Sequence, residues 1–130
     1  MKQHECVSFI LLRNEQVLLE TRAAHKLTDP GLITIPGGHI EPGETQLQAL
    51  ARELDEELAI TPIQYHYLCS LYHPTLELQL IHYYVIREWL GELTALEAEK
   101  VQWYSLDSES VGIEADKIAL KEIKRVLHCL

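Results

Sequence analysis

Three acidic side chains gather near the end of one predicted helix, just after a glycine-rich loop. Glu53, Glu56 and Glu57 share one face of a helix that turns by about 100° per residue. Like charges at these spacings repel one another, and the C-terminal half of a helix already disfavours negative charge. A divalent cation would relieve both costs, because Mg²⁺ prefers carboxylate oxygens as ligands. The pattern predicts a metal site, with a solvated acidic face as the alternative interpretation.

The helix that carries these carboxylates has clear limits in the sequence. Thr45 is a favourable N-cap, and Gln48 three residues later completes a capping box. We therefore expect the helix to begin near Gln46 and to end near Leu58. Its predicted buried stripe consists of Leu47, Leu50, Ala51, Leu54 and Leu58. Gly37-Gly38, just upstream, is predicted to turn sharply and to bring the backbone close to a ligand.

The remaining segments predict a mixed sheet and a second helix. We expect strands at 6–12, 16–22, 32–36, 65–72, 76–87 and 101–106, and a helix at 118–130. Two helices against a mixed sheet make an α/β or α+β sandwich. The length of 130 residues favours one domain that covers 1–130.

Composition argues against several classes of protein. No apolar run is long enough to span a membrane and no signal-peptide pattern follows Met1, so no membrane partner and a cytoplasmic location are expected. Cys6, Cys69 and Cys129 are far apart and form no Cys-x-x-Cys pair, which favours reduced, buried thiols. The net charge of −9 argues against a nucleic-acid polymer as partner. It is compatible with a small anionic substrate when metal ions supply positive charge.

A specific pattern of residues now points to a known family. Gly38, five residues, Glu44, seven residues and then Arg52 to Glu57 together resemble the Nudix box, Gly-x5-Glu-x7-Arg-Glu-U-x-Glu-Glu-x-Gly-U, where U is aliphatic. Six fixed positions would match by chance with odds of about one in 10⁵ in a chain of this length. Ala59 replaces the glycine of the box, which costs about 1–2 kcal/mol if this residue has a positive φ.

From Cys6 to about Leu106 the chain is similar to MutT-type members, and this resemblance implies a fold and an activity. The fold would be the Nudix α/β/α sandwich, and the reaction would convert a nucleoside triphosphate to a nucleoside monophosphate and pyrophosphate. Mg²⁺, with Mn²⁺ as a substitute, would lower the pKa of the attacking water. The implied metal ligands are Glu53, Glu56, Glu57 and the carbonyl oxygen of Gly37.

The resemblance also assigns supporting roles around these ligands. Arg52 would orient Glu53, and Glu44 would hold the loop or a water behind the metal ligands. An ordinary surface salt bridge is the alternative for both. Family members often carry a further carboxylate shortly before a tryptophan, and Glu97 and Glu99 both precede Trp103 here. Glu97 has the MutT-type spacing and would act as general base or metal ligand, with a solvated loop carboxylate as the alternative.

Substrate selection is predicted only in outline. Asp116 is positioned like a base-contacting residue of MutT-like and cytidine-triphosphate-hydrolysing relatives, and a helix N-cap is the alternative. Tyr83 could stack on a base or lie in the core. Arg22 and Lys26 could meet phosphates or face solvent. Ala23 stands where oxidised-guanine enzymes usually carry another basic residue, which weakens an assignment to 8-oxo-dGTP.

Two other functions are compatible with the sequence. A hydrolase of the same family could act on a nucleoside diphosphate linked to another group, such as a nucleotide sugar or ADP-ribose. A non-catalytic nucleotide-sensing module would tend to lose carboxylates of the box, which this chain keeps. In each case the expected partner is a small-molecule nucleotide, and the chain is expected to be a monomer or a homodimer.

Overall fold

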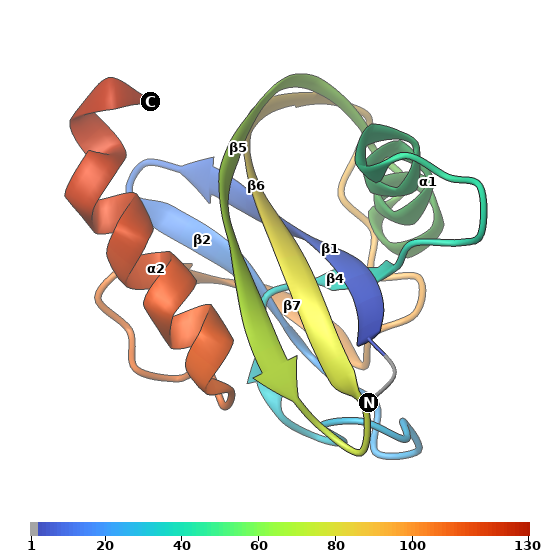
Figure 1. Ribbon diagram of the computed structural model, residues 1–130. Coiled ribbons are helices and arrows are strands. Elements are labelled where there is room, and N and C mark those ends of the chain that lie inside the picture. The colour runs from blue at the N-terminus through green and yellow to red at the C-terminus, as the bar shows by residue number, and fades with distance from the viewer. Residues whose placement is uncertain (1–2) are drawn as a thin grey trace.

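A mixed β-sheet is built around the first strand, β1 (Gln3–Arg13), in the computed structural model, which describes residues 3–130 (Figure 1). Along one edge β1 runs parallel to β6 (Leu78–Leu90). Along its other edge β1 pairs antiparallel, first with β4 (Gly37–His39) and further on with β2 (Gln16–Thr21). The first strand is therefore shared by two parts of the sheet, because its neighbour on one side changes.

The other strands extend these two parts. β3 (Ile33–Thr34) and β7 (Lys100–Ser105) both pair antiparallel with β2, and β5 (Thr61–Pro74) pairs antiparallel with β6. The main path through the sheet is β3-β2-β1-β6-β5. β5 is thus an edge strand, while β1 and β6 lie in the interior of the sheet.

One helix covers each face of this sheet, so the predicted α/β/α sandwich is confirmed. In Figure 1, α1 (Gln46–Leu58) lies at the right and α2 (Glu114–Val126) at the left. Alternate residues of the central strands fill two separate cores. The core beneath α2 includes Ile10, Leu12, Ile81, Tyr83 and Val85, and the core beneath α1 includes Phe9, Leu11, Tyr84 and Ile86.

The first helix begins and ends where the sequence predicts. The Gln48 N–H donates to Thr45 Oγ1 at 3.1 Å, and the Thr45 N–H donates to Gln48 Oε1 at 2.9 Å, which confirms the capping box. The predicted buried stripe is wrong at Leu47 and Ala51, which are exposed. The buried residues are Ala49, Leu50, Glu53, Leu54 and Leu58. The buried face is turned toward Glu53 because this side of the helix packs against β4.

Several predicted boundaries differ from those observed. Gly37-Gly38, predicted as a turn, lies in a short strand whose backbone pairs with β1. α2 begins four residues before the predicted start and gives way to a 3-10 turn at Leu127–Cys129. Cys129 is exposed, although a buried thiol was predicted. Within residues 3–130, no helix combines the length and the apolar composition that crossing a membrane requires.

Ala59, immediately after α1, has a left-handed backbone with φ 59° and ψ 36°. Glycine adopts this conformation without a Cβ penalty, so Ala59→Gly is expected to increase the free energy of unfolding by about 1 kcal/mol. Ala51→Gly, at an exposed position inside the same helix, is the matched control and should decrease it by about 0.5–1 kcal/mol. Chemical denaturation of the three proteins measures both changes. A loss of stability in Ala59→Gly would contradict this account of the helix end.

Candidate active site

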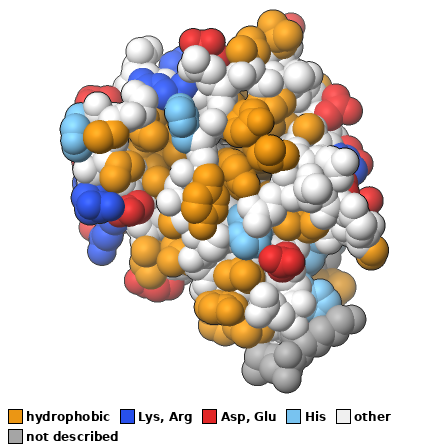
Figure 2. Space-filling view, turned by 45° about the horizontal axis from the view of Figure 1, so that its top comes forward, with side chains coloured by type: hydrophobic (Ala, Val, Ile, Leu, Met, Phe, Trp, Pro, Cys, Tyr) orange, Lys and Arg blue, Asp and Glu red, His pale blue; other side chains and the backbone are white. Residues whose placement is uncertain are grey.

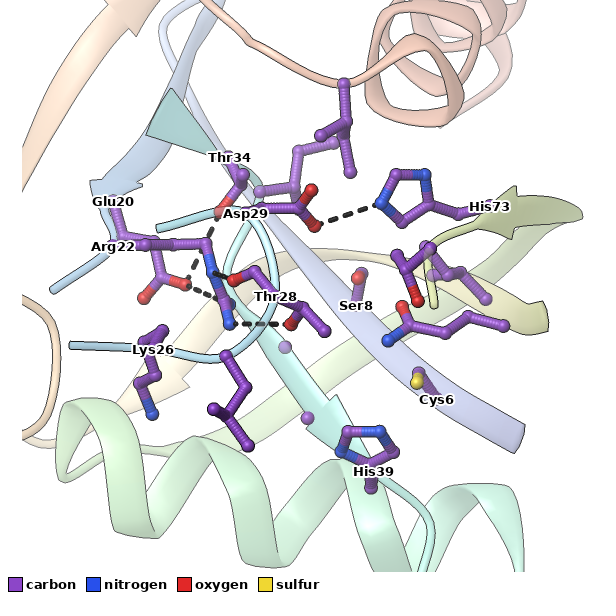
Figure 3. Close-up of a pocket in the computed structure, with 18 of the residues that line it drawn as sticks. Cys6, Ser8, Glu20, Arg22, Lys26, Thr28, Asp29, Thr34, His39 and His73 are labelled. Atoms are coloured by element: carbon purple, nitrogen blue, oxygen red, sulfur yellow. Dashed lines mark hydrogen bonds and ion pairs between the residues drawn. The ribbon is translucent and has the colours of Figure 1, made fainter. Parts of the chain in front are cut away.

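An acidic cleft of about 670 Å³ is lined by residues of the sheet, both helices and the loop that follows β2 (Figure 3). Among the described residues, eight carboxylates line it against two permanently charged cations, Arg22 and Lys26. The carboxylates are Glu20, Asp29, Glu41, Glu53, Glu57, Glu77, Glu97 and Asp116. Because so much negative charge repels an anion, an anionic ligand requires added cations here.

Arg52 connects the loop before α1 to the acidic face of the helix. Its Nε donates to Glu44 Oε2 at 2.6 Å and its Nη2 to Glu44 Oε1 at 2.9 Å, a two-point contact that holds the pKa of Glu44 down at about 2. The same Nη2 donates to the carbonyl oxygen of His39 at 2.9 Å. Nη1 donates to Glu53 at 2.8 Å and to Glu56 at 3.1 Å. One guanidinium therefore fixes the loop and two of the predicted metal ligands.

The two adjacent glycines of β4 allow the strand to lie very close to its neighbours. A Cβ on Gly38 would overlap the carboxylate of Glu53. A Cβ on Gly37 would overlap the carbonyl oxygen of Val7 and crowd Ser8 on β1. Glycine at both positions is thus required by close approach, and it brings backbone next to the carboxylates of α1.

Glu57 is the least stabilised carboxylate of the cleft. Its Oε2 is buried, and within residues 3–130 it has no hydrogen-bond partner. Burial raises the pKa of Glu57 to about 9, and the charges of Glu20, Glu53 and Glu97 add to this effect. Burial also raises the pKa of Glu53, although Arg52 opposes it. Glu57 therefore holds a proton at neutral pH, and a bound cation would displace it.

The donor set at this end of the cleft fits a divalent cation. It combines a buried carboxylate oxygen without a partner, a second carboxylate against a glycine and oxygen atoms of the kind that Mg²⁺ prefers. Across residues 3–130, no three His, Cys, Asp or Glu side chains are arranged to hold a metal ion as they stand. Glu53 and Glu56 are turned toward Arg52, and Glu56 lies outside the cleft lining. A cation at this end would therefore compete with Arg52 for both carboxylates.

The loop before β7 brings only one of its two candidate carboxylates to the cleft. Glu97 lies in the cleft lining, and its charge contributes to the raised pKa of both Glu53 and Glu57. Glu99 is outside the lining, and its N–H donates to the carbonyl oxygen of Thr21 at 3.1 Å. The geometry therefore favours Glu97 over Glu99.

Asp116 lies at the bottom of the cleft and is 1% exposed. Its N-cap interpretation is wrong, because α2 has Ile113 as its N-cap. Oδ2 accepts from the Ile35 N–H at 2.8 Å, and Oδ1 accepts from the Tyr83 hydroxyl at 2.7 Å. Tyr83 is fully buried in the core beneath α2, so the structure gives a base no surface of Tyr83 to stack on. Among residues 3–130, the hydrogen bond to Asp116 connects the Tyr83 hydroxyl to the cleft lining.

The two cations of the lining differ in how tightly they are held. Arg22 donates from Nε to the Thr28 carbonyl oxygen at 3.0 Å and from Nη2 to Thr28 Oγ1 at 3.2 Å, and Nη1 lies 3.8 Å from Glu20. In the described part of the chain no ion pair involves Lys26, whose side chain lies on the same side of the cleft as Glu20 (Figure 3). Lys26 is therefore the cation that is free to meet a ligand.

Sequence reasoning missed Glu20, a buried carboxylate of β2. It is 6% exposed, and burial raises its pKa to about 6. It lies 3.5 Å from the Thr34 hydroxyl, which donates to it. A signal was present, because Glu20 interrupts the apolar strand at a position that the fold buries. What the sequence does not show is that this strand ends beside the carboxylates of α1.

Comparisons with known sequences agree with this geometry. The NUDIX domain family matches residues 2–126. The chain is 32% identical over 111 residues to an 8-oxo-dGTP diphosphatase of Escherichia coli (strain K12), which covers 85% of this chain and 82% of that protein. It is 36% identical over 107 residues to the CTP pyrophosphohydrolase of the same organism, covering 81% and 78%.

A solved structure supports the same fold. The crystal structure of a MutT NUDIX hydrolase from Burkholderia pseudomallei aligns with a TM-score of 0.86 and 25% identity, over 95% of this chain and 99% of that chain. The fold and the placement of the acidic helix are thus those of a known structural class.

The buried Asp116 makes the free energy of unfolding depend on pH. Burial raises its pKa from 3.8 to about 6, so its contribution to stability is complete below pH 4 and is lost as the pH rises through 6. Asp116→Asn mimics the protonated carboxyl group and should therefore keep this contribution to stability at every pH. The difference in unfolding free energy between variant and wild type should grow between pH 4 and 7 by on the order of 3 kcal/mol, since each pKa unit is worth about 1.4 kcal/mol.

Denaturation curves at several pH values test this expectation. Asp55→Asn, which removes an exposed carboxylate of α1 outside the cleft lining, is the control for the loss of one negative charge. Parallel curves for Asp116→Asn and wild type would show that the buried carboxylate does not titrate as described.

Proposed function

The chain belongs to the NUDIX family, and from this premise we propose that it is a Mg²⁺-dependent pyrophosphohydrolase that cleaves a nucleoside triphosphate to a nucleoside monophosphate and pyrophosphate. Mn²⁺ is the expected substitute. The observation that carries the proposal is the acidic cleft, in which the carboxylates of α1 lie against a glycine strand and the buried Asp116 is part of the same lining.

Glu53, Glu56, Glu57 and the Gly37 carbonyl oxygen are the groups that would hold the metal. When bound, Mg²⁺ neutralises phosphate charge and lowers the pKa of a water molecule. Support comes from the balance of charge, because two cations in a lining with eight carboxylates cannot neutralise a triphosphate. Glu57 supplies a buried oxygen that has no hydrogen-bond partner within residues 3–130.

Arg52 and Glu44 are positioning residues in this proposal. The two-point contact between them fixes the guanidinium, which then holds Glu53 until a cation competes for that carboxylate. The contact of Arg52 with the carbonyl oxygen of His39 ties the glycine strand to the same arrangement. Helix face and glycine strand therefore keep one relative position during turnover.

Glu97 is the proposed general base. It lies on an exposed loop within the cleft lining, so it has access to water as well as to the carboxylates of α1. An ionised carboxylate there can take a proton from the attacking water. Lys26 and Arg22, the two cations of the lining, would meet the phosphates.

The substrate is assigned at the level of a nucleoside triphosphate. Relatives of known activity include an 8-oxo-dGTP diphosphatase and a CTP pyrophosphohydrolase. Ala23, in place of a second basic residue, favours a substrate other than oxidised dGTP. Asp116 would contact the base if the base-binding role known from similar enzymes holds here.

A release assay tests the function directly. With Mg²⁺ and a panel of ordinary and oxidised nucleoside triphosphates, nucleotide sugars and ADP-ribose, we expect pyrophosphate from one group of triphosphates and no turnover after EDTA treatment. Turnover confined to the diphosphate-linked compounds would move the assignment to those substrates. Absence of turnover with every compound of the panel would contradict an enzymatic role.

A melting-temperature measurement tests whether Mg²⁺ binds at this site without depending on turnover. Mg²⁺ should raise the melting temperature of the wild type, because a ligand that binds the native state stabilises it. Glu57→Gln should lose this increase, whereas Asp55→Asn on the same helix should retain it. An unchanged increase in Glu57→Gln would exclude Glu57 as a ligand.

The general base is tested with a matched pair of carboxylates two residues apart. Glu97→Gln should lower kcat by about 10²–10⁴-fold, the usual contribution of a general base, with little change in melting temperature. Glu99→Gln should keep normal activity, because Glu99 lies outside the cleft lining. Equal activities in the two variants would remove Glu97 from the mechanism.

A further inference from the structure

Gln79, on β6, is a buried amide that the proposed hydrolysis does not use. It is 7% exposed and lies in the cleft lining. Within residues 3–130 its side chain makes no hydrogen bond to another residue. The buried polar atoms that lack a partner in this range do not include its amide nitrogen or oxygen, so both atoms reach the open cleft. The amide is therefore free to bond a ligand that enters the cleft.

The position of Gln79 in the sheet shows which part of a ligand it can reach. It pairs with His4 on one side and His73 on the other, which makes a polar row across three strands. Two residues further along β6, on the same face, Ile81 pairs with Cys6 and gives this part of the cleft an apolar floor. An apolar floor bordered by a polar row suits the flat face and the hydrogen-bonding edge of a nucleobase.

This part of the cleft is distinct from the part with cations. Figure 3 shows His73 and Cys6 on one side, away from Glu20 and Lys26 on the other. If the phosphates lie beside Lys26 and the carboxylates of α1, as proposed, the base extends toward Gln79.

The charged groups around this end select among bases. Asp29, Glu77 and Asp116 line it, and ionised carboxylates only accept hydrogen bonds. Asp29 lies 3.0 Å from His73 Nε2 and Glu77 lies 3.0 Å from His4 Nε2, while both oxygens of Asp116 already accept hydrogen bonds. The lone pairs that remain on Asp29 and Glu77 attract an exocyclic amine of a base and repel a carbonyl oxygen.

We propose that Gln79 hydrogen-bonds the edge of the nucleobase and makes the cleft prefer a base that carries an exocyclic amine beside a ring nitrogen, as cytosine and adenine do. This inference rests on the proposed function, because it concerns the substrate of the same site. The amide oxygen accepts from the amine and the amide nitrogen donates to the ring nitrogen, the pairing that glutamine also makes with adenine in DNA.

Substrate pairs that differ at this edge test the proposal. CTP is compared with UTP, and ATP with the triphosphate of purine riboside, which lacks only the amine. In wild type we expect the amine-bearing member of at least one pair to have the higher kcat/KM. Gln79→Met, which keeps the size but removes donor and acceptor, should lower kcat/KM for that member by about 10–100-fold and leave its partner nearly unchanged.

Gln64→Met is the control, since Gln64 is an exposed glutamine on β5 outside the cleft lining, and it should keep the wild-type preference. Gln79→Glu keeps the shape and a hydrogen-bond acceptor, so it should still favour the substrate with the amine. If Gln79→Met melts at a lower temperature, the substrate preference of Gln79→Glu tests the proposal instead. An equal effect of Gln79→Met on both members of each pair, or no effect, would overturn the proposal.

A binding measurement separates failure of this inference from failure of the proposed function. If wild type turns over no triphosphate, calorimetry with CMP and UMP still reports on the base end of the cleft. Tighter binding of CMP by wild type that disappears in Gln79→Met supports the role of Gln79 without hydrolysis. Equal binding of the two nucleotides, or no binding of either, overturns it.

Discussion

The contact between Gly38 of β4 and Glu53 of α1 is the constraint on which the rest of this structure depends. The glutamate carboxylate occupies the space that a side chain at position 38 would need, so strand and helix can lie this close only with glycine there. A larger residue would either pull β4 away from β1 or push Glu53 out of the cleft. The glycine strand, the helix and the guanidinium of Arg52 therefore form one unit, whose relative positions are set by close packing together with the hydrogen bonds of Arg52.

The charges of this unit are unfavourable for the protein alone. Burial raises the pKa of Glu57, Glu53 and Glu20, and a single arginine compensates for part of the repulsion. A protein can retain such an arrangement when the rest of the fold supplies the stability, and here two separate cores on opposite faces of the sheet do so. A cation bound among these carboxylates would relieve part of the repulsion, so its binding would recover free energy that the fold alone leaves unfavourable.

Local chemistry made some features predictable from the sequence. The capping box fixed the start of α1, and the spacing of its carboxylates predicted their common face, because both depend on residues within one helix. The strand at Gly37–His39 was not predicted, since its backbone pairs with residues thirty positions earlier. The same limit applies to the cleft. Contacts between distant segments decide that Glu97 rather than Glu99 lies in its lining, and that Glu20 and Gln79 lie there too. No local pattern in the sequence records such contacts.

The central place of β1 affects the order in which the chain can fold. β1 is the first described strand, yet its longest partner is β6, so that Gln3 pairs with Leu78 and Leu11 with Ile86. During synthesis β1 leaves the ribosome long before this partner exists. β2 and β4 can pair with its other edge, but the backbone groups along the edge that β6 covers stay unpaired until then. Closing a loop of this size is an entropic cost that must be met before the parallel pairing returns any energy. Assembly of the central sheet is therefore a late step, and the acidic cleft beside it can form only when most of the chain has been made.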